Sequence, residues 1–590
     1  MKKVLHLLFI AGLIATLGTL SSCKKNSKDD GDNNLRKANG GRYYGGVFKI
    51  NEPEFIKTLF PHNITDAVST RVSSQIYEGL FKFDPSDLSI KKCLIDDYTV
   101  DSSGTVYTFK LKKGVFFHND PCFPGGKGRQ LTANDVKYCF TLLCTQNANN
   151  QGFGSVFKDV LKGSNEYFAK SAGGKTPDKE LEGVKVVDDF TFQVLLTKPS
   201  SIFLFNLARP FTFIFPKEAY EKYGLEMRTK AIGTGPFMLQ NIDDDISIIL
   251  KKNDNYHNKD EFGNKLPFLD AVDIRFLRDK KTELFEFKKG NFSMIYRLPT
   301  EYIIEILEET GSNENGEYSQ YELQRKPEMS TLFMSFLNTG ELFKNRNLRK
   351  AFSFAIDREK ILEYVLNGEG YAPGFHGITP PSFANYPIDS IRGYTLNLDS
   401  AKYYLTKAGY PNGKGFPEIV LQLNSDGDRK SNVAIEVQKQ LKENLNVNIK
   451  LEIIPLSTLV ENMIGGKTNF YYTGWGADFP SPENFLALFY GKDVPTAPNT
   501  KSYPNFARYK NPAFDKLYEE ALVAKSIEEA NRKFLKAEQI LMSDAPIIVL
   551  WYDEGYRLVQ SYIKNFPNNP MQIRDYSEVY IEKTKKVKEK

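Results

Sequence analysis

Cysteine, histidine and tryptophan are all scarce in this sequence. Its 590 residues include 5 Cys, 5 His and 2 Trp. The histidines do not stand at the spacing of metal ligands, and no His-Glu-x-x-His is present, so the sequence predicts no metal site. Neither Cys-x-x-Cys nor Gly-x-Ser-x-Gly occurs, which removes the usual redox pair and the nucleophile elbow of many hydrolases. We therefore expect no cofactor and no enzymatic activity.

An excess of charge of either sign is also lacking. The sequence has 78 Lys and Arg against 73 Asp and Glu, which gives a net charge of only +5. The lysine-rich tail, 583–590, is short, and there is no basic stripe suited to nucleic acid. Two Gly-Gly-Lys-Thr segments, 173–176 and 465–468, resemble phosphate loops but lack the earlier glycine of that motif. Binding of nucleic acids or nucleotides is therefore not expected.

No apolar run is long enough for a comfortable membrane span. The run 7–20 follows a positively charged start and is typical of a secretory signal peptide, residues 1–22. It leads into Leu-Ser-Ser-Cys, which resembles a bacterial lipobox and predicts a lipid on Cys23. Residues 23–42 are polar and predict a flexible tether, with the folded body beginning near residue 43. We expect an exported protein that its lipid anchors to a bacterial membrane, in the cell envelope or periplasm.

Four cysteines remain after lipidation, and their pairing is open. An exported location permits disulfides, but the spacing of the cysteines does not determine which would pair. Cys139 falls on the apolar face of a predicted helix, where a free buried thiol is expected. The four are Cys93, Cys122, Cys139 and Cys144.

Hydrophobic periodicity predicts both strands and helices. Alternation over 104–111 predicts a half-buried strand whose inward residues are aromatic or aliphatic. A capping box of Thr132 and Asp135 predicts the start of a helix, and a second helix is predicted from Asp66 to Leu80. An apolar stripe over 348–356 predicts a core helix. Together with alternating strands and helices after residue 398, these patterns favour an α/β fold.

The segment 474–480, Gly-Trp-Gly-Ala-Asp-Phe-Pro, places one carboxylate among aromatic and small residues. Glycines on both sides of Trp475 leave room for a ligand to approach. A carboxylate in an apolar setting needs a cation, and the ammonium group of a ligand would supply one to Asp478. From these residues alone, Asp478 could equally cap the turn before Pro480. Both interpretations stay open at this point.

Several blocks along the chain, taken in order, resemble one known family. The blocks are Tyr77-Glu78-Gly79-Leu80, 107–118 with 131–136, Gly233-Thr234-Gly235-Pro236-Phe237, 255–256 with 266–270, 336–339, 347–362, 474–478 and 505–515. They are similar to extracellular solute-binding proteins of the dipeptide/oligopeptide/nickel class, the receptors of ABC importers. The resemblance covers nearly the whole mature chain, and the departure is a longer Gly/Pro-rich loop at 121–128.

The resemblance implies a fold of the large, type II periplasmic-binding-protein kind. Two α/β lobes would close around a ligand like a hinge, and one lobe would carry an extra inserted subdomain. Lobe I would be discontinuous and join 43–69, 204–290 and 548–590. Residues 70–202 would form the inserted subdomain, and 292–547 would form lobe II.

The resemblance also implies a ligand and partners. In peptide-binding members, the aspartate of the Gly-Trp-x-Ala-Asp block holds the α-ammonium of the peptide, which carries over to a buried Asp478. Trp475, Gly476 and Ala477 would line the same site, with core packing as the alternative for Trp475. The expected partners are peptides and a permease with its ATPase, and the expected receptor is a monomer.

Three further residues are candidates for ligand contacts. Arg429 stands roughly where dipeptide binders keep an arginine for the ligand carboxylate, and the favoured alternative is a solvated surface charge. Phe153 lies in a Gly-rich segment, 152–157, that would face the cleft. His376 lies in a loop, where a structural role is the alternative.

Other functions stay open. A receptor of the same fold could bind a nickel chelate, haem or an oligosaccharide, and nickel-binding relatives hold a metal complex, so the lack of metal ligands does not exclude that ligand. A secreted lipoprotein hydrolase is a remote alternative, because the sequence offers no nucleophile–base set. The last alternative is a scaffold lipoprotein that binds no small ligand.

Overall fold

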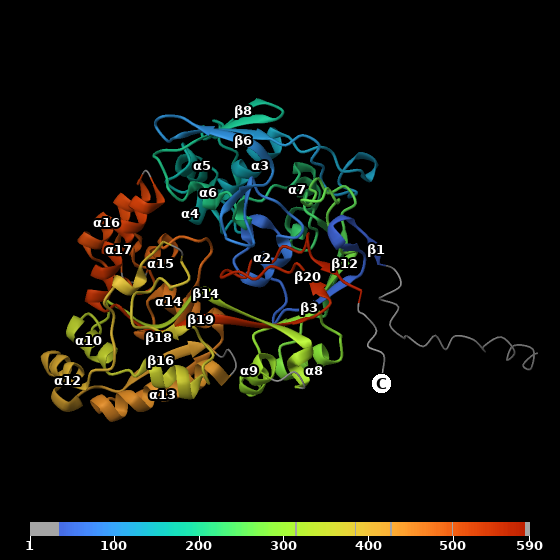
Figure 1. Ribbon diagram of the computed structural model, residues 1–590. Helices are drawn as coiled ribbons and strands as arrows, with labels where there is room; N and C mark the ends of the chain where they lie inside the picture. The colour runs from blue at the N-terminus through green and yellow to red at the C-terminus, as the bar shows by residue number, and fades with distance from the viewer. Residues whose placement is uncertain are drawn as a thin grey trace, which may run out of the picture.

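The computed structural model describes residues 35–312, 316–383, 385–424, 428–497, 500–524 and 526–583. The predicted signal peptide and the predicted lipidation site Cys23 lie outside the described residues. Helices and strands are mixed throughout these ranges, which confirms the predicted α/β class. One large sheet runs through the middle of the molecule (Figure 1).

The large sheet contains 11 strands of the described chain, in the order β10-β11-β12-β3-β13-β19-β14-β18-β16-β17, with β15 paired to β19. In that order they are β10 (Phe237–Asp243), β11 (Ser247–Lys252), β12 (Ala271–Arg275), β3 (Val47–Asn51), β13 (Met294–Tyr296), β19 (Ile547–Gln560), β14 (Tyr321–Phe336), β18 (Phe470–Gly476), β16 (Ile419–Asn424), β17 (Ile449–Ile454) and β15 (Ala372–Pro373). The long strands β14 and β19 lie side by side in the middle of the sheet and join its two halves (Figure 1).

The pairing of β14 with β19 is irregular at its centre. Pro327 and Thr331 both keep partners in β19, but residues 328–330 between them stand against the single residue Asp553. Extra residues of this kind bend a strand and increase its twist. We call this place the crossing, because the sheet passes here from one half of the molecule to the other.

Two large cores lie on either side of the crossing. The N-terminal body is built mainly from residues 48–294 together with 559–579, and the C-terminal body from 329–552. The predicted lobe boundary, 547/548, coincides with the first residues of β19. β19 itself contributes Ile548 to the second core and Val559 to the first, so this strand belongs to both bodies.

The N-terminal body carries smaller sheets and short helices. A four-stranded sheet has the order β6-β7-β9-β8 and lies at the top of Figure 1. Its strands are β6 (Ile95–Val100), β7 (Val106–Leu111), β9 (Thr191–Leu195) and β8 (Val184–Asp188). The two-stranded sheets are β1 (Arg36–Lys37) with β2 (Tyr43–Tyr44), β4 (Phe81–Phe83) with β5 (Ile90–Lys92), and β20 (Ile563–Lys564) with β21 (Tyr580–Ile581). The helices are α2 (Ala67–Ser73), α3 (Ala133–Leu143), α4 (Phe153–Val156), α5 (Ser164–Lys170), α6 (Phe203–Asn206), α7 (Lys217–Tyr223) and α8 (Lys280–Lys288).

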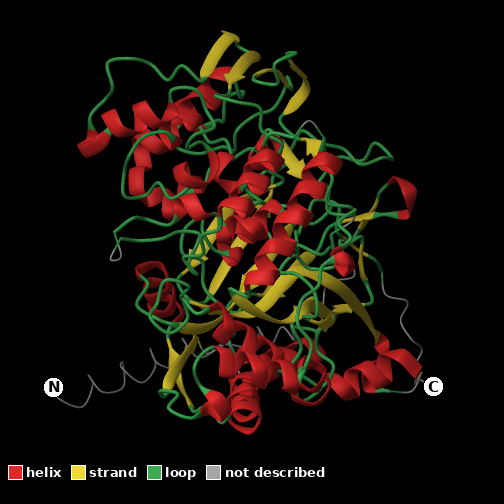
Figure 2. Cartoon of the chain, turned by 90° about the vertical axis from the view of Figure 1, so that its left-hand side faces the viewer, coloured by secondary structure: helices red, strands yellow, loops and turns green. Residues whose placement is uncertain are grey.

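The remaining helices follow α8 in the chain, and helices cover both sides of the long strands (Figure 2). They are α9 (Ile303–Ser312), α10 (Arg346–Phe354), α11 (Arg358–Lys360), the π-helical turn η8 (Ile361–Val365), α12 (Leu398–Lys407), α13 (Asp428–Leu445), α14 (Leu456–Gly465), α15 (Glu483–Leu486), α16 (Pro512–Leu522) and α17 (Ile527–Asp544). None of the helices in the described part of the chain combines the length and apolar character needed to cross a membrane.

Hydrophobic patterns located the cores correctly. In β7 the predicted inward residues Tyr107, Phe109 and Leu111 are buried. In α3 the predicted capping box is present, with Asp135 accepting a hydrogen bond from Thr132 N at 2.9 Å. The stripe over α10 is confirmed, because the residues predicted to face inward are fully buried; they are Leu348, Ala351, Phe352, Ala355 and Ile356.

Helix α2 is shorter than predicted. It begins after Asp66, as expected, but ends at Ser73 instead of near Leu80. The next carbonyl groups bind another segment: Gly235 N donates to Ile76 O at 2.9 Å. A Cβ at Gly235 would lie 2.7 Å from that oxygen, so the predicted tight Gly-Thr-Gly-Pro-Phe crossing needs glycine here. Pairing with a distant segment therefore ends the helix, which local periodicity cannot show.

Residues 35–42 belong to the folded body, so the prediction of a tether up to residue 42 is wrong for them. Arg36–Lys37 pairs with Tyr43–Tyr44 as a short antiparallel ladder. Arg42 is 9% exposed and donates to Asp260 Oδ2 at 2.8 Å. A buried carboxylate from a segment more than 200 residues away holds this polar stretch, which composition alone does not reveal.

The four cysteines of the folded body are all free thiols. Cys139 is buried on α3, as predicted from its position on the apolar face. Burial raises the pKa of Cys139 and of Cys144. No disulfide therefore forms among Cys93, Cys122, Cys139 and Cys144.

Candidate functional site

The segment 474–480 lies directly beside the crossing. β18 ends at Gly476, which pairs with Ser330 of β14. The next residue, Ala477, donates its backbone N–H to Met329 O at 2.8 Å. Asp478 therefore leaves the sheet at the place where β14 is bent, between the two bodies.

The carboxylate of Asp478 pairs with an arginine from the N-terminal body. Arg209 Nη2 lies 2.9 Å from Asp478 Oδ2, and the Asp478 side chain is 49% exposed. The prediction of a buried carboxylate is therefore wrong for this structure. The turn-cap alternative also fails, because the carboxylate binds Arg209 and it is the backbone N–H of Asp478 that donates to Asn484 Oδ1, at 3.0 Å. The second oxygen, Oδ1, has no hydrogen-bond partner among the described residues.

Arg209 is fixed by its surroundings. Its side chain is only 9% exposed. Nη1 donates to Ser155 O at 3.3 Å and to Asn206 Oδ1 at 3.4 Å. The guanidinium carbon lies 5.4 and 5.5 Å from the ring centroids of Phe211 and Phe479. These contacts desolvate the cation and leave Asp478 as its only carboxylate partner among the described residues.

Asn484 links the aromatic and acidic parts of the segment. Its Oδ1 accepts from Trp475 Nε1 at 3.0 Å as well as from the Asp478 backbone. Trp475 is partly buried against the C-terminal core, so it both packs and borders the site. Beside it, a Cβ at Gly476 would meet only Met329 O, at 4.0 Å, whereas one at Gly474 would lie 2.6 Å from Leu332. Room for a ligand is thus present at Gly476 and not at Gly474.

Two further side chains surround Asp478 and Arg209. Partial loss of hydration raises the pKa of the Tyr503 hydroxyl, and the charge of Asp478 adds to the rise while Arg209 opposes it. Burial likewise raises the pKa of Glu483, although its hydrogen bond from Tyr518 and the charge of Arg209 lower it. Tyr503 as a whole remains 55% exposed, so it offers an accessible aromatic ring near the Asp478 carboxylate.

Arg429 is neither a solvated charge nor a free ligand for a carboxylate. It lies at the crossing, where its Nη2 donates to Asp553 Oδ1 at 2.8 Å and to Glu369 O at 2.7 Å. Asp553 Oδ2 accepts from Arg297 Nη2, also at 2.7 Å. The favoured alternative of a surface charge is therefore wrong, because the Arg429 side chain is 16% exposed and occupied by an ion pair.

Burial and charge act in opposite directions on the acids of the crossing. Burial alone would raise the pKa of Asp553, but Arg297 and Arg429 outweigh it and hold that pKa well below its ordinary value. The pKa of Glu328 is raised, mainly by burial and also by Asp553. Burial also raises the pKa of Glu369. Asp553 thus carries the negative charge to which both arginines are bound.

The two remaining candidates make structural contacts. Phe153 is 7% exposed and stacks on Phe168 with ring centroids 4.0 Å apart, so the expectation of a ring facing a cleft is wrong. His376 Nδ1 lies 3.1 Å from Ile391 O, and its Nε2 lies 3.7 Å from Asp389 Oδ1. Both partners of His376 come from one neighbouring loop, which fits the structural alternative.

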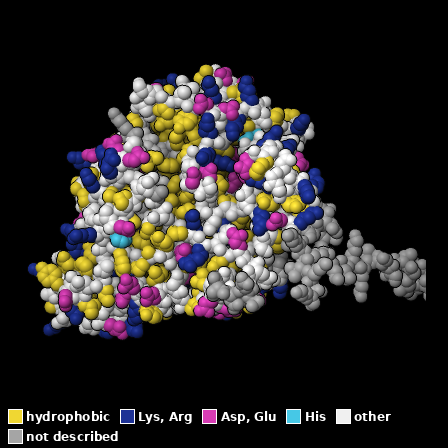
Figure 3. All heavy atoms as spheres, in the orientation of Figure 1, with side chains coloured by type: hydrophobic (Ala, Val, Ile, Leu, Met, Phe, Trp, Pro, Cys, Tyr) yellow, Lys and Arg dark blue, Asp and Glu magenta, His cyan; other side chains and the backbone are white. Residues whose placement is uncertain are grey.

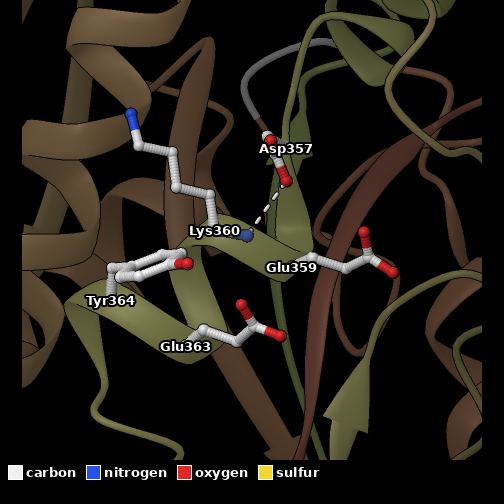
Figure 4. A pocket seen from close by; sticks show the side chains of 5 residues that line it. All are labelled: Asp357, Glu359, Lys360, Glu363 and Tyr364. Atoms are coloured by element: carbon white, nitrogen blue, oxygen red, sulfur yellow. Dashed lines mark hydrogen bonds between the residues drawn. The ribbon is translucent and has the colours of Figure 1, made fainter.

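A surface pocket of about 470 Å³ lies elsewhere in the C-terminal body (Figure 4). It is lined by Asp357, Glu359, Lys360, Glu363 and Tyr364. Glu359 and Glu363 point to one side, whereas Lys360 and Tyr364 lie on the other (Figure 4). None of these residues contacts Asp478, and the backbone N–H and ammonium of Lys360 already bind Asp357 and Glu436. The pocket is therefore separate from the candidate site.

The face seen in Figure 3 bears hydrophobic side chains along its middle, between the upper and lower parts of the molecule. Charged side chains border this apolar region on the same face (Figure 3). Among the described residues, no group of three or more His, Cys, Asp or Glu could hold a metal ion. At the candidate site, the half-exposed carboxylate of Asp478 near the exposed ring of Tyr503 suits the binding of an organic cation.

Sequence reasoning did not find Arg209, Phe479 or Tyr503 as parts of this site. Arg209 stands in an apolar stretch, 202–215, and a lone charge in such a stretch predicts a buried ion pair. That signal would have selected Arg209 but not its partner, because Asp478 is 269 residues away in the chain.

Comparison with known proteins finds one family model and relatives that match most of the chain. The family model described as "Bacterial extracellular solute-binding proteins, family 5 Middle" matches residues 89–496. The oligopeptide-binding protein AppA of Bacillus subtilis is 24% identical over 97% of both chains. The glutathione-binding protein GsiB of Salmonella paratyphi A is 27% identical over 86% of this chain and 88% of its own.

A solved structure confirms the fold. The periplasmic binding protein DppA of Helicobacter pylori, in complex with the peptide STSA, superposes with a TM-score of 0.76 at 24% identity, covering 92% of this chain and 99% of DppA. The predicted two-lobed periplasmic-binding-protein fold is thereby confirmed. The family match covers more than half of the 590 residues. The chain belongs to the bacterial extracellular solute-binding proteins of family 5.

Proposed function

We propose that this protein is the peptide receptor of an ABC importer and that Asp478 binds the α-ammonium group of the peptide. Relatives named as oligopeptide-binding proteins match it over nearly its whole length, which supports the ligand class. The observation that carries the proposal is the half-exposed carboxylate of Asp478 between the two bodies, with Oδ1 open to a ligand. A charge-assisted hydrogen bond at this place binds an ammonium group strongly.

The surroundings of Asp478 suit a peptide N-terminus. Trp475 and Tyr503 provide aromatic surface near the carboxylate for the first side chain. Gly476 leaves open space next to the end of β18, where a peptide backbone can lie along the sheet edge. Recognition through the backbone and the ammonium group tolerates many side chains, as a general peptide receptor requires.

We also propose the domain assignment that the family resemblance implies. Lobe I would join 43–69, 204–290 and 548–590, residues 70–202 would form the inserted subdomain, and 292–547 would form lobe II. The four-stranded sheet β6-β7-β9-β8 supports a separate subdomain, since all its strands fall within 70–202. The lipid on Cys23 would anchor the receptor beside its permease.

A library of random tetrapeptides, offered with free and with acetylated N-termini, tests the proposal. Native mass spectrometry of the purified protein should show peptide adducts with the free library and far fewer with the acetylated one. Asp478→Asn should weaken binding of a captured free peptide about 10- to 100-fold, which is the worth of a hydrogen bond to a charged group. Binding of the acetylated form of that peptide should change little.

The matched control is Asp244→Asn, an exposed aspartate in the turn between β10 and β11. It should bind both peptide forms as the unmodified protein does. If the protein captures no peptide from the free library, the ligand class is wrong. If it captures free and acetylated peptides equally well, Asp478 does not recognise an ammonium group.

A further inference from the structure

Arg209 stands beside the carboxylate that would bind the ligand, and the proposed function does not use it. Its Nη2 lies 2.9 Å from Asp478 Oδ2, so a cation and an anion are neighbours in the candidate site. Arg209 belongs to the N-terminal body, whereas Asp478 follows β18 of the C-terminal body. A ligand held between the two bodies at Asp478 therefore meets Arg209 as well.

Two aromatic rings pack on the guanidinium of Arg209 and leave one edge of it accessible. The guanidinium carbon lies 5.4 Å from the ring centroid of Phe211 and 5.5 Å from that of Phe479. Nη1 donates to Ser155 O and Asn206 Oδ1. Nε–H forms no hydrogen bond with any described residue, and the Nε atom is not fully buried. The edge that carries Nε and Nη2 is suited to bidentate binding of a carboxylate.

The charges of the site would not balance with an ordinary peptide. An α-linked first residue brings a positive ammonium group, which would share the carboxylate of Asp478 with Arg209. Asp478 is the only carboxylate within ion-pair distance of Arg209 among the described residues. Glu483 does not replace it, because its carboxylate accepts a hydrogen bond from Tyr518 and burial raises its pKa. One cation would thus lack a partner in the closed site, which is costly away from water.

A second anion on the ligand would remove this imbalance. It has to lie next to the ammonium group, because Oδ1 and Oδ2 belong to one carboxylate and Oδ2 already contacts Arg209. A free α-carboxylate on the same carbon as the α-ammonium group meets this condition. It is present where the first residue is linked to the next through its side chain, as in γ-glutamyl peptides. Ordinary α-linked peptides lack it.

We propose that Arg209 is a specificity-determining residue, which binds the free α-carboxylate of a side-chain-linked first residue while Asp478 binds its α-ammonium group. This inference rests on the proposed function, because Arg209 meets the carboxylate only if Asp478 holds the ammonium group beside it. The receptor then favours γ-glutamyl peptides over α-linked peptides of the same composition. Ordinary peptides still bind through Asp478, without the contact to Arg209.

Two isomeric tripeptides test this preference in the unmodified protein. γ-Glu-Leu-Gly and α-Glu-Leu-Gly contain the same atoms and carry the same charges, and they differ only in which carboxyl group of glutamate forms the peptide bond. Isothermal titration calorimetry should give an affinity about 10- to 100-fold higher for the γ isomer, which is the worth of hydrogen bonds between charged groups. Equal affinities, or tighter binding of the α isomer, would overturn the proposal.

The variant Arg209→Gln tests which residue causes the preference. It should weaken binding of the γ isomer by the same factor and leave the α isomer nearly unchanged, so that the two affinities become similar. Asp478→Asn should weaken both isomers alike, because both present the same ammonium group. If Arg209→Gln also weakens both alike, the role of Arg209 is structural. If it strengthens both, Arg209 only competes with the ammonium group. Either result contradicts the proposal.

The matched control is Arg275→Gln, which removes another arginine of the N-terminal body that is paired with an aspartate. Arg275 Nε lies 2.9 Å from Asp273 Oδ1, and the Arg275 side chain is 46% exposed. This variant should keep the full preference for the γ isomer. Failure of the proposed function gives a different result, because the unmodified protein would then capture no peptide from the free library. A protein that captures library peptides but does not favour the γ isomer refutes only the role of Arg209.

Discussion

Asp553 is the residue at the crossing whose loss we expect to cost the most. Its two carboxylate oxygens bind different arginines, Arg297 Nη2 at 2.7 Å and Arg429 Nη2 at 2.8 Å. Arg297 follows β13, in the middle of the large sheet, and Arg429 stands at the start of the helix α13, so one carboxylate of β19 ties these two elements together. The change Asp553→Asn keeps the volume and removes the charge.

The expected loss of stability arises because both arginines lose the charged partner that they share. Breaking a buried ion pair by removing one partner costs about 3–5 kcal/mol, because the other charge stays buried and uncompensated. Two guanidinium groups share Asp553, but Arg297 also binds Glu328 Oε2 at 2.7 Å, and the two side chains are 28% and 16% exposed, so a second carboxylate and water relieve part of the penalty. We therefore expect the free energy of unfolding to fall by about 3 kcal/mol, the lower end of that range.

Urea unfolding followed by circular dichroism measures this loss. Asp244→Asn is the control and should stay within about 0.5 kcal/mol of the unmodified protein. The difference between Asp553→Asn and the unmodified protein should also depend on pH. The folded pKa of Asp553 is depressed, so its contribution is complete above its ordinary value of about 3.9 and is lost as pH falls below it. A loss under 1 kcal/mol at neutral pH would refute the reasoning.

Two further predictions concern acid stability and the membrane. Burial between Phe60 and Phe215 lowers the pKa of His62 to about 3, and neither ring nitrogen has a hydrogen-bond partner among the described residues. Below about pH 6.5 the unfolded chain therefore binds a proton at His62 that the folded protein does not bind. As the pH falls from 6.5 to 3, the free energy of unfolding decreases by up to about 1.4 kcal/mol per pH unit. His62→Leu should remove that slope from urea unfolding measured across this range, and an unchanged slope would contradict the assignment. Cys23→Ser should move the protein from the membrane fraction to the soluble fraction and abolish labelling by radioactive palmitate; a variant that stays membrane-bound and labelled would disprove lipidation at this residue.

The sequence predicted elements whose contacts are local. The burial of Phe109 in β7 and of Phe352 in α10 follows from hydrophobic spacing, because the period of a strand or helix determines which residues share a face. The family resemblance gave the two-lobed fold because its blocks span the chain. The end of α2 at Ser73 was missed, since a hydrogen bond from Gly235 to Ile76 determines it.

The composition of the site was predicted only in part for the same reason. Asp478 was selected from its own segment, but its partner Arg209 lies 269 residues away and Phe479 enters a core built from other segments. Arg429 was selected from its position in the family resemblance, and the structure shows it bound to Asp553, 124 residues later. Pairing of charges that are distant in the sequence depends on the packed fold. No local sequence pattern indicates which carboxylate an arginine will bind.

The positions of Asp553, Asp478 and Phe479 together explain how closure and ligand binding would be linked. β18 pairs with β14 as far as Ser330, next to the bend that Asp553 faces, and three residues after the end of β18 the chain enters the N-terminal core at Phe479. Asp478 is thus held between the crossing and the inserted ring, and any rotation of the bodies moves its carboxylate relative to Arg209. Loosening the crossing should therefore weaken the binding of free and acetylated peptides alike. Only the loss of the Asp478 charge should discriminate between them.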